Sequence, residues 1–463
     1  MNVYTTRLPS HAGLPAAFAD LSFLRMPLAT ARQARLRGRF ALCPEIDLTL
    51  YRFEAVIDYV KIAFTSHGPS QMRHVQNAFN AVTPSASGKV PWVKRVDGTD
   101  ASALGFEVTI QDPVVRELAE CDRMLRTRFG MTTSARVVEL EVSLDVYPRS
   151  GSDDDRGRMV GALQRCYLPK FNFLDDAQAR PRFATGKTPA MQHLYKWHDS
   201  HQARKALTNG DPDAWLKPES AHSPYVDTTL YIGAKEGDEL IRIQSKVTNR
   251  RSKGVADDLV QKEKRARVEV RLRGAALSQV GLADVAELLG FDFATLQKKY
   301  FHFVFPSFPN EHGNGLSSEI QKRMNNLSIA HFLKTGAVGM ILVETGKDAS
   351  RRRPAKDGTG KTLNAALRER VKASGRKPAT RRAGTGVHGS TLAFPAMNDR
   401  MREALRNLCA RSKTQLKPNV AASVSKPSKT LIKTAYAGKL GAEVIESTAA
   451  PNFLGRGKAS ACL

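Results

Sequence analysis

A set of three short segments of alternating polar and apolar residues limits the possible folds of this chain most strongly. A turn joins the first two, and the third follows closely. The segment from 227 to 274 reads DTTLYIGAKEGDELIRIQSK, then a basic linker, then RARVEVRLRG. Polar and apolar residues alternate in these runs, and successive side chains of a strand point to opposite faces. The pattern predicts a hairpin over 228–246 and a strand over 266–273, each with one polar face.

The rest of the core alternates between strand and helix patterns. Strands are predicted for VIDYVKIAFTS, GFEVTIQ and ARVVELEVSLDVY, and helices for SQMRHVQNAFNAV and PVVRELAECDRMLRTRFG. Helical spacing then dominates from ALSQVGLADVAELL through FATLQKKYFHF to LSSEIQKRMNNLSIAHFLKT. The predicted fold class is therefore α+β, with a mostly antiparallel sheet covered by helices, followed by a helical region and a disordered basic tail.

These patterns divide the chain into four parts. Residues 1–50 are predicted to be an irregular basic segment with a short helix in RMPLATARQARLRGRFAL, and residues 51–290 an α+β domain. Residues 291–346 are predicted to be a helical extension. Residues 347–463 are predicted to be a largely disordered basic tail, with short helices at 362–374 and 396–411.

The charge of the chain indicates a polyanionic partner. The formal net charge is +26, and from residue 347 onward 25 Lys and Arg residues stand against 7 Asp and Glu residues. Such a balance is typical of nucleic-acid-binding proteins. A basic protein with a solvated surface, or a ribosome-like scaffold, is the alternative.

Cysteine usage and hydropathy bear on the compartment. The five cysteines are scattered, and no CxxC pair occurs. This favours a reducing compartment and argues against a cysteine metal site. No segment approaches the roughly 18 apolar residues of a membrane span. The first residues lack the basic start and apolar run of a signal peptide. We therefore expect a cytoplasmic protein with no membrane partner.

The strand RVVELEVSLDVY places Glu139, Glu141, Ser143 and Asp145 on one face. Ionised carboxylates in line repel one another, and a divalent cation such as Mg²⁺ or Mn²⁺ relieves that repulsion through hard oxygen ligands. The alternative is an amphipathic edge strand with a solvated acidic face.

The strand RARVEVRLRG has the complementary pattern, with Arg267, Glu269, Arg271 and Arg273 on one face. Glu269 could join Glu141 or Asp145 at a metal while the arginines hold phosphates. A ladder of salt bridges between strands is the alternative.

Tyr231 is the candidate nucleophile on spacing. A tyrosine can attack a DNA phosphate and become linked to the new 5′ end, with a metal beside the phosphate. A tyrosine that only packs its ring is the commoner case for any single residue. Tyr225, Tyr195 and Tyr300 are rivals for the role.

Four motifs occur in the order found in the rolling-circle replication initiation factor family, which comprises plasmid and phage Rep proteins and related nickases. VIDYVKIAF resembles the family's opening strand, and ELEVSLD resembles its R-I-D-x-x-x-D strand, with Glu141 and Asp145 at the acidic positions. TLYIGAKEGDELIRIQSK resembles its T-L-Y-I-G-S-R…R-I-Y-D-K hairpin, and RVEVRLR its R-x-E-x-x-L-R strand. The resemblance covers about residues 55–290.

The resemblance implies a plasmid or phage replication initiator that binds an origin, nicks one strand with a divalent metal and stays joined through a phosphotyrosine. Glu141, Asp145 and Glu269 would bind Mg²⁺ or Mn²⁺. The cations that would contact DNA are Arg242, Lys246, Arg267, Arg271 and Arg273. Single-stranded or cruciform origin DNA is the implied partner, with a host helicase as a further candidate.

Two positions depart from the family pattern. Glu139 stands where the family has arginine, and Gln244 stands where it has the tyrosine of R-I-Y-D-K. A hairpin turning around Glu236–Gly237 would pair Tyr231 with Arg242, diagonal to Gln244 on the same face. We hypothesise that Tyr231 acts instead. A non-catalytic origin-binding protein, a general basic nucleic-acid-binding protein and a mobilisation relaxase remain the alternatives.

Overall fold

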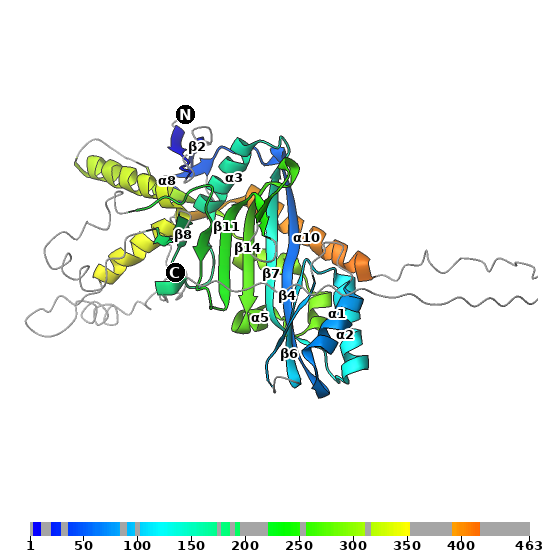
Figure 1. Cartoon of the computed structure of the whole chain (residues 1–463). Coiled ribbons are helices and arrows are strands. Elements are labelled where there is room, and N and C mark those ends of the chain that lie inside the picture. Colours follow the sequence, from blue (N-terminus) through cyan, green and yellow to red (C-terminus); the bar gives the residue numbers. More distant parts are fainter. Residues whose placement is uncertain are drawn as a thin grey trace, which may run out of the picture. The chain divides into compact units, whose positions relative to one another are not determined.

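A nine-stranded antiparallel sheet organises the computed structural model (Figure 1). The structure describes residues 3–10, 20–28, 36–83, 90–97, 102–173, 177–185, 190–194, 221–250, 256–310, 316–351 and 391–416. From one edge to the other the strands are β5 (Trp92–Arg95), β6 (Ala103–Gln111), β4 (Tyr51–Ser70), β7 (Arg136–Pro148), β14 (Arg265–Arg273), β11 (Glu239–Lys246), β10 (Leu230–Ile232), β8 (Arg182–Thr185) and β9 (Ala190–His193).

The hairpin and the strand that follows it form as predicted. β10 pairs with β11 so that Tyr231 lies opposite Arg242, and β11 pairs with β14 so that Arg242 lies opposite Glu269. The basic linker between them contains a two-stranded ribbon of β12 (Thr248–Arg250) and β13 (Ala256–Asp258).

The acidic strand β7 lies inside the sheet, between β4 and β14. The alternative of an edge strand with a solvated acidic face is therefore wrong. Glu139, Glu141 and Asp145 are at most 4% exposed, because β14 arginines and β4 side chains surround them. Burial of this kind requires each carboxylate to have a compensating partner.

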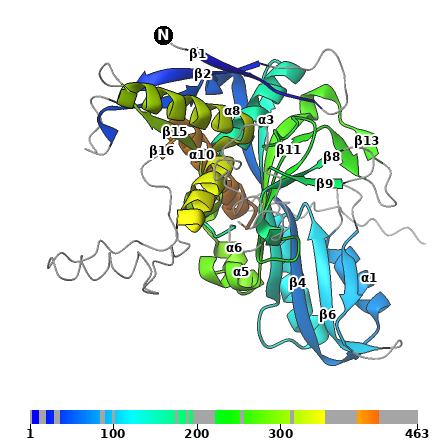
Figure 2. The ribbon, with the colours of Figure 1, turned by 90° about the vertical axis from the view of Figure 1, so that its left-hand side faces the viewer.

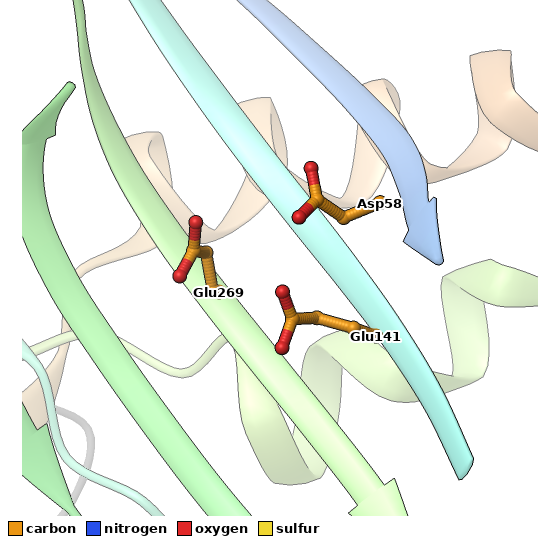
Figure 3. A group of neighbouring side chains, drawn as sticks. All are labelled: Asp58, Glu141 and Glu269. Atoms are coloured by element: carbon orange, nitrogen blue, oxygen red, sulfur yellow. The ribbon is translucent and has the colours of Figure 1, made fainter. Parts of the chain in front are cut away.

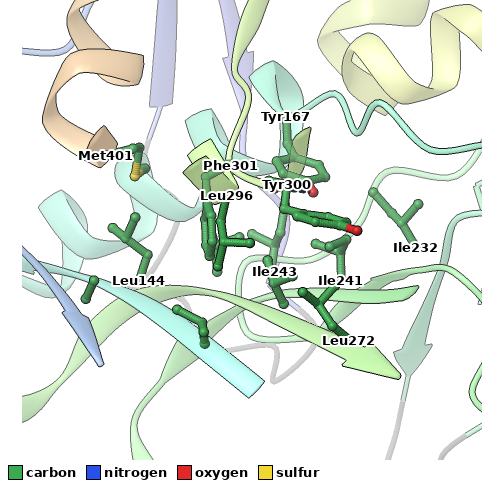
Figure 4. Packing of buried hydrophobic residues seen from close by; sticks show 14 of the residues in the cluster. Leu144, Tyr167, Ile232, Ile241, Ile243, Leu272, Leu296, Tyr300, Phe301 and Met401 are labelled. Atoms are coloured by element: carbon green, nitrogen blue, oxygen red, sulfur yellow. Dashed lines mark hydrogen bonds between the residues drawn. The ribbon is translucent and has the colours of Figure 1, made fainter. Parts of the chain in front are cut away.

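Helices pack against the apolar face of the sheet. They include α1 (Met72–Val82), α2 (Val115–Phe129), α3 (Asp153–Cys166) and α10 (Pro395–Leu416). Phe64 of β4 contacts Phe79 of α1 and Phe129 of α2 through their rings. Figure 4 shows Met401 of α10 above Leu144 of β7, in the apolar layer of the core. The polar side chains of the same strands point to the opposite face. The predicted α+β class, with an antiparallel sheet covered by helices, is confirmed.

The prediction that residues 1–50 are irregular is wrong for the part that the structure describes. β1 (Val3–Arg7), β2 (Asp20–Pro27) and β3 (Arg39–Pro44) join β15 (Val304–Pro309) and β16 (Thr391–Ala393) in a five-stranded sheet, seen in Figure 2. Apolar side chains such as Phe23 and Phe40 are buried in these strands. Their runs are too short for a periodic pattern to stand out from the basic residues between them.

The prediction of a wholly helical extension over 291–346 is also wrong in part. The run VFPSFP forms β15, because its prolines lack the N–H that a helix interior requires. Short helical elements precede it: η6 (Phe293–Leu296), α7 (Gln297–Tyr300), α6 (Val285–Gly290) and α5 (Gly274–Val280). Three further 3-10 turns are η2 (Leu48–Leu50), η3 (Ala177–Ala179) and η5 (Gln261–Glu263).

The predicted boundary at residue 346 falls inside a helix. α8 (Leu316–Arg351) runs past it and is broken at Gly336, where φ is 72°. The predicted helix at 396–411 is present within α10, but it belongs to the folded core, because Met401 and Leu405 are fully buried. The predicted helix at 362–374 and the chain after residue 416 lie outside the described residues. Among the helices in the described ranges, none has the length and apolar character needed to cross a membrane.

Candidate metal and nucleic-acid site

Carboxylates from neighbouring strands converge on the polar face of the sheet. Asp58 of β4, Glu141 of β7 and Glu269 of β14 bring ligand oxygens within 4.8 Å of one another. Figure 3 shows the three carboxylates, which come from three neighbouring strands. Glu141 is 1% exposed and Glu269 is 3% exposed, whereas Asp58 is half-buried. We refer to these residues as the carboxylate triad. Glu141 and Glu269 were predicted as metal ligands, and Asp58 was not.

A bulge in β4 aims Asp58 at the triad. Ile57 lies opposite Val142 and Tyr59 lies opposite Glu141, so Asp58 is an extra residue on β4. A bulge of this kind sets two residues against one and redirects a side chain. Regular alternation would have turned Asp58 to the apolar face.

The guanidinium groups in contact with the triad are fewer than its carboxylates. Arg242 Nη2 lies 2.5 Å from Glu141 Oε2, and Arg242 Nε lies 2.6 Å from Glu269 Oε2. Arg267 Nη1 lies 3.0 Å from Asp58 Oδ1 and 3.4 Å from Glu269 Oε1. Two guanidinium groups thus face three carboxylates.

Burial is the main influence on the protonation of Glu141, and the charges of neighbouring carboxylates add to it. Burial raises the pKa of Glu141 to about 8 in spite of Arg242, and the charges of Glu269 and Asp58 add to the rise. For Asp58, burial opposes ionisation, but the charges of Arg267, Lys246 and Arg242 and a hydrogen bond with Glu141 together outweigh it and lower the pKa. Glu141 Oε1 accepts no hydrogen bond from an N–H or hydroxyl donor, and the protonated Glu141 carboxyl has the Asp58 carboxylate as its hydrogen-bond partner. An orphaned buried carboxylate oxygen between two other carboxylates fits a hard divalent cation such as Mg²⁺ or Mn²⁺.

Asp145 does not join the triad, contrary to the sequence prediction. Arg267 binds it in a fork, with Nε 2.5 Å from Oδ1 and Nη2 2.7 Å from Oδ2. Arg265 Nε adds a contact of 2.9 Å to Asp145 Oδ2. Both oxygens are occupied, so Asp145 fixes the arginines of β14.

The arginines predicted to bind phosphate form a ladder of ion pairs within the sheet. Arg273 Nε lies 2.8 Å from Glu139 Oε2, and its Nη1 lies 3.1 Å from Glu236 Oε2. Arg271 Nη2 donates to the Lys235 carbonyl, while its buried Nε has no hydrogen-bond partner. Arg267 is buried against Asp145, and Arg242 is engaged by the triad. The alternative of salt bridges between strands therefore holds for the arginines of β14. Arg242 of β11 is paired with carboxylates in the same way.

Lys246 differs from the predicted arginines. Burial, together with the positive charge of Arg267, lowers the pKa of this half-buried ammonium. In the described part of the chain Lys246 forms no close ion pair with a carboxylate, although the charges of Glu269 and Asp58 oppose the fall in its pKa. An external phosphate would relieve the repulsion between Lys246 and Arg267.

The tyrosine candidates occupy different positions. Tyr231 is half-buried on β10, two strands from β14, with Arg242 between it and Glu269 and the Arg182 guanidinium 5.8 Å above its ring. Tyr300 is fully buried and donates to Glu239, and Tyr225 packs its ring against Phe183. Tyr195 lies outside the described residues.

Gln244 takes the place of the family's tyrosine beside the triad. Its Nε2 donates to Glu269 Oε1 at 2.9 Å, and its Oε1 accepts from Thr229 at 3.0 Å. A side chain at this position therefore reaches a triad carboxylate directly.

Asp58 was missed because its role depends on the bulge. The Ile-Asp pair of the opening strand was the available signal, since it belongs to the motif VIDYVKIAF. Tyr59, directly after it, gave no signal of its own.

No protein-family model matches the chain, and no curated protein sequence matches it.

Proposed function

We propose that this protein is a metal-dependent DNA endonuclease that initiates replication of a plasmid or phage. It would bind an origin in the cytoplasm, nick one strand through a tyrosine hydroxyl and remain joined to the 5′ end. The observation that carries the proposal is the carboxylate triad with its orphaned Glu141 oxygen on the polar face of the sheet.

The triad can be reached from solvent. The side chains of Asp58 and Arg242 keep 28% and 30% exposure, whereas Glu141 and Glu269 lie beneath them. A bound divalent ion would polarise the scissile phosphate and stabilise the charge of the transition state. Asp58, Glu141 and Glu269 would hold that ion.

Cations around the triad would position the DNA backbone. Lys246 and Arg271 offer donors beside the triad, and Arg242 can exchange its triad carboxylates for a phosphate once a cation has bound. The basic residues after position 347 would add affinity that is independent of sequence and falls steeply with salt. A host helicase would be a further partner.

The test uses labelled single-stranded DNA, supercoiled DNA and Mn²⁺ or Mg²⁺, with EDTA as the blank. Nicking and a covalent protein–DNA adduct are expected from the wild-type protein and are expected to disappear in Glu269→Gln. Glu107→Gln is the matched control, because Glu107 of β6 is half-buried on the same face but lies outside the triad. Metal-independent nicking, or equal activity of both variants, would refute the proposal.

A non-catalytic origin-binding protein is the second candidate. It is favoured by Gln244 at the family's tyrosine position and by the occupation of two triad members by Arg242. Tight, sequence-selective binding without any metal-dependent nick or adduct would establish it.

A further inference from the structure

A second functional side chain of β4 lies beside the triad. Asp58 and Tyr59 both stand opposite Glu141, because the bulge sets these two residues against one. Side chains directly opposite each other on neighbouring strands have Cβ atoms about 5 Å apart. Tyr231 is separated from Glu269 by the whole of β11, and Arg242 fills the intervening position. Tyr59 is therefore the tyrosine nearer to the triad.

The hydroxyl of Tyr59 contacts a proton acceptor. It donates a hydrogen bond to Glu139 Oε1. Glu139 is 4% exposed and is held from its other side by Lys61 Nζ at 3.0 Å and Arg273 Nε at 2.8 Å. These cations orient the Glu139 carboxylate toward the phenol.

A donor without a partner lies next to the same group. Arg271 of β14 is directly opposite Glu141, and its buried Nε is 3.9 Å from Glu139 Oε1 without a hydrogen bond. An unpaired guanidinium N–H in a buried place is costly unless an anion completes it. A phosphate between Arg271 and the triad would satisfy this donor within reach of Tyr59.

We propose that Tyr59 is the nucleophile of the strand-cleavage reaction. The inference rests on the proposed function and names the residue that carries it out. Tyr59 Oη attacks the phosphorus and forms a P–O bond as the bond to the 3′-oxygen breaks with its electron pair. The phenolic proton passes to Glu139, and the departing 3′-oxygen takes a proton from water. The products are a 5′-phosphotyrosyl protein and a free 3′-hydroxyl end.

Tyr147 provides a matched control. It is half-buried on the same polar face, and its hydroxyl lies 3.4 Å from Asp145 Oδ2. Arg52 and Arg265 lie against its ring, 4.0 Å and 5.5 Å from the centroid. Loss of a hydroxyl at Tyr147 removes a similar bond to a carboxylate, but no triad member is beside it.

The experiment uses full-length protein, Mn²⁺ and a 3′-labelled single-stranded oligonucleotide pool. Tyr59→Phe is expected to reduce adduct and nicking to the level of the EDTA blank, while Tyr147→Phe retains both. Mass spectrometry of the wild-type adduct is expected to find the nucleotide on the peptide containing Tyr59. The mapping needs no variant, so it holds even if Tyr59→Phe is poorly folded.

The outcomes separate this inference from the proposed function. An adduct that maps to Tyr231, or that persists in Tyr59→Phe and is lost in Tyr231→Phe, overturns the role of Tyr59 and leaves the nuclease in place. Metal-dependent nicking without any tyrosine adduct also overturns the role of Tyr59 and leaves the nuclease in place. If the wild-type protein neither nicks DNA nor forms an adduct, both the role of Tyr59 and the proposed nuclease function are refuted.

Discussion

Replacing the buried Glu141 with glutamine should remove one contribution to the pH dependence of the free energy of unfolding. Burial raises the pKa of Glu141 to about 8, from an ordinary 4.5. Between these values the folded chain keeps a proton that the unfolded chain releases. The stabilisation is fully present below pH 4.5 and is lost as the pH rises through 8. Each pH unit in the window is worth about 1.4 kcal/mol, so the whole effect is on the order of 5 kcal/mol.

The measurement is urea unfolding in EDTA at intervals from pH 5 to pH 8. Glu141→Gln keeps the shape of the protonated side chain and removes its titration. Its free energy of unfolding, minus that of the wild type, should increase by up to about 1.4 kcal/mol per pH unit. Groups that titrate in both proteins and do not interact with Glu141 cancel in this difference. Glu107→Gln, outside the triad, is the control for the loss of a carboxylate elsewhere on the same face.

A constant difference between Glu141→Gln and wild type from pH 5 to pH 8 would refute the reasoning. It would mean that Glu141 is ionised throughout, with its charge fully met by Arg242. Saturating Mn²⁺ supplies a second check, because an ion that replaces the proton should stabilise the wild type more at pH 8 than at pH 6.

Three further predictions concern the fold. Burial lowers the pKa of His302 to about 4, so wild-type stability should fall as the pH drops from 6.5 toward 4, and His302→Gln should weaken that fall in acid-unfolding curves. Leu144→Ala removes a fully buried side chain under α10 and should cost roughly 3 kcal/mol in urea unfolding, whereas Leu144→Met should cost less than about 1.5. Gly336→Ala should lower the melting temperature, because φ is +72° and a Cβ would lie 2.6 Å from Arg165 Cα, while Gly290→Ala meets nothing within 4 Å and should not.

Local patterns were sufficient to predict the central strands and one face of the site. Alternation alone placed Glu141 and Glu269 on the polar faces of their strands, and the turn residues gave the pairing of Tyr231 with Arg242. These features depend on neighbours in the chain or on one adjacent strand. These predictions hold because side chains alternate along a strand, so the sequence determines which of them share a face.

The remaining parts of the site depend on distant partners. Asp145 has the same face and charge as Glu141, and only the forked contact from Arg267 separates their roles. Asp58 reaches the triad through a bulge that exists only when β4 pairs with β7. The sequence of β4 alone therefore does not predict the bulge.

Helix α10 has a consequence for how the chain must be made. It packs on β4 and on η6, and Met401 covers Leu144, yet the last strand of the site, β14, ends at Arg273. At roughly 5–20 residues per second, a ribosome needs on the order of ten seconds to pass from that strand to the end of α10. During this interval the part of the apolar face that α10 covers, on β4 and around Leu144, stays open, and a nascent chain is exposed to aggregation there. A recombinant fragment should therefore end after Leu416, since a version stopped at the last strand would expose the buried side chains that α10 covers.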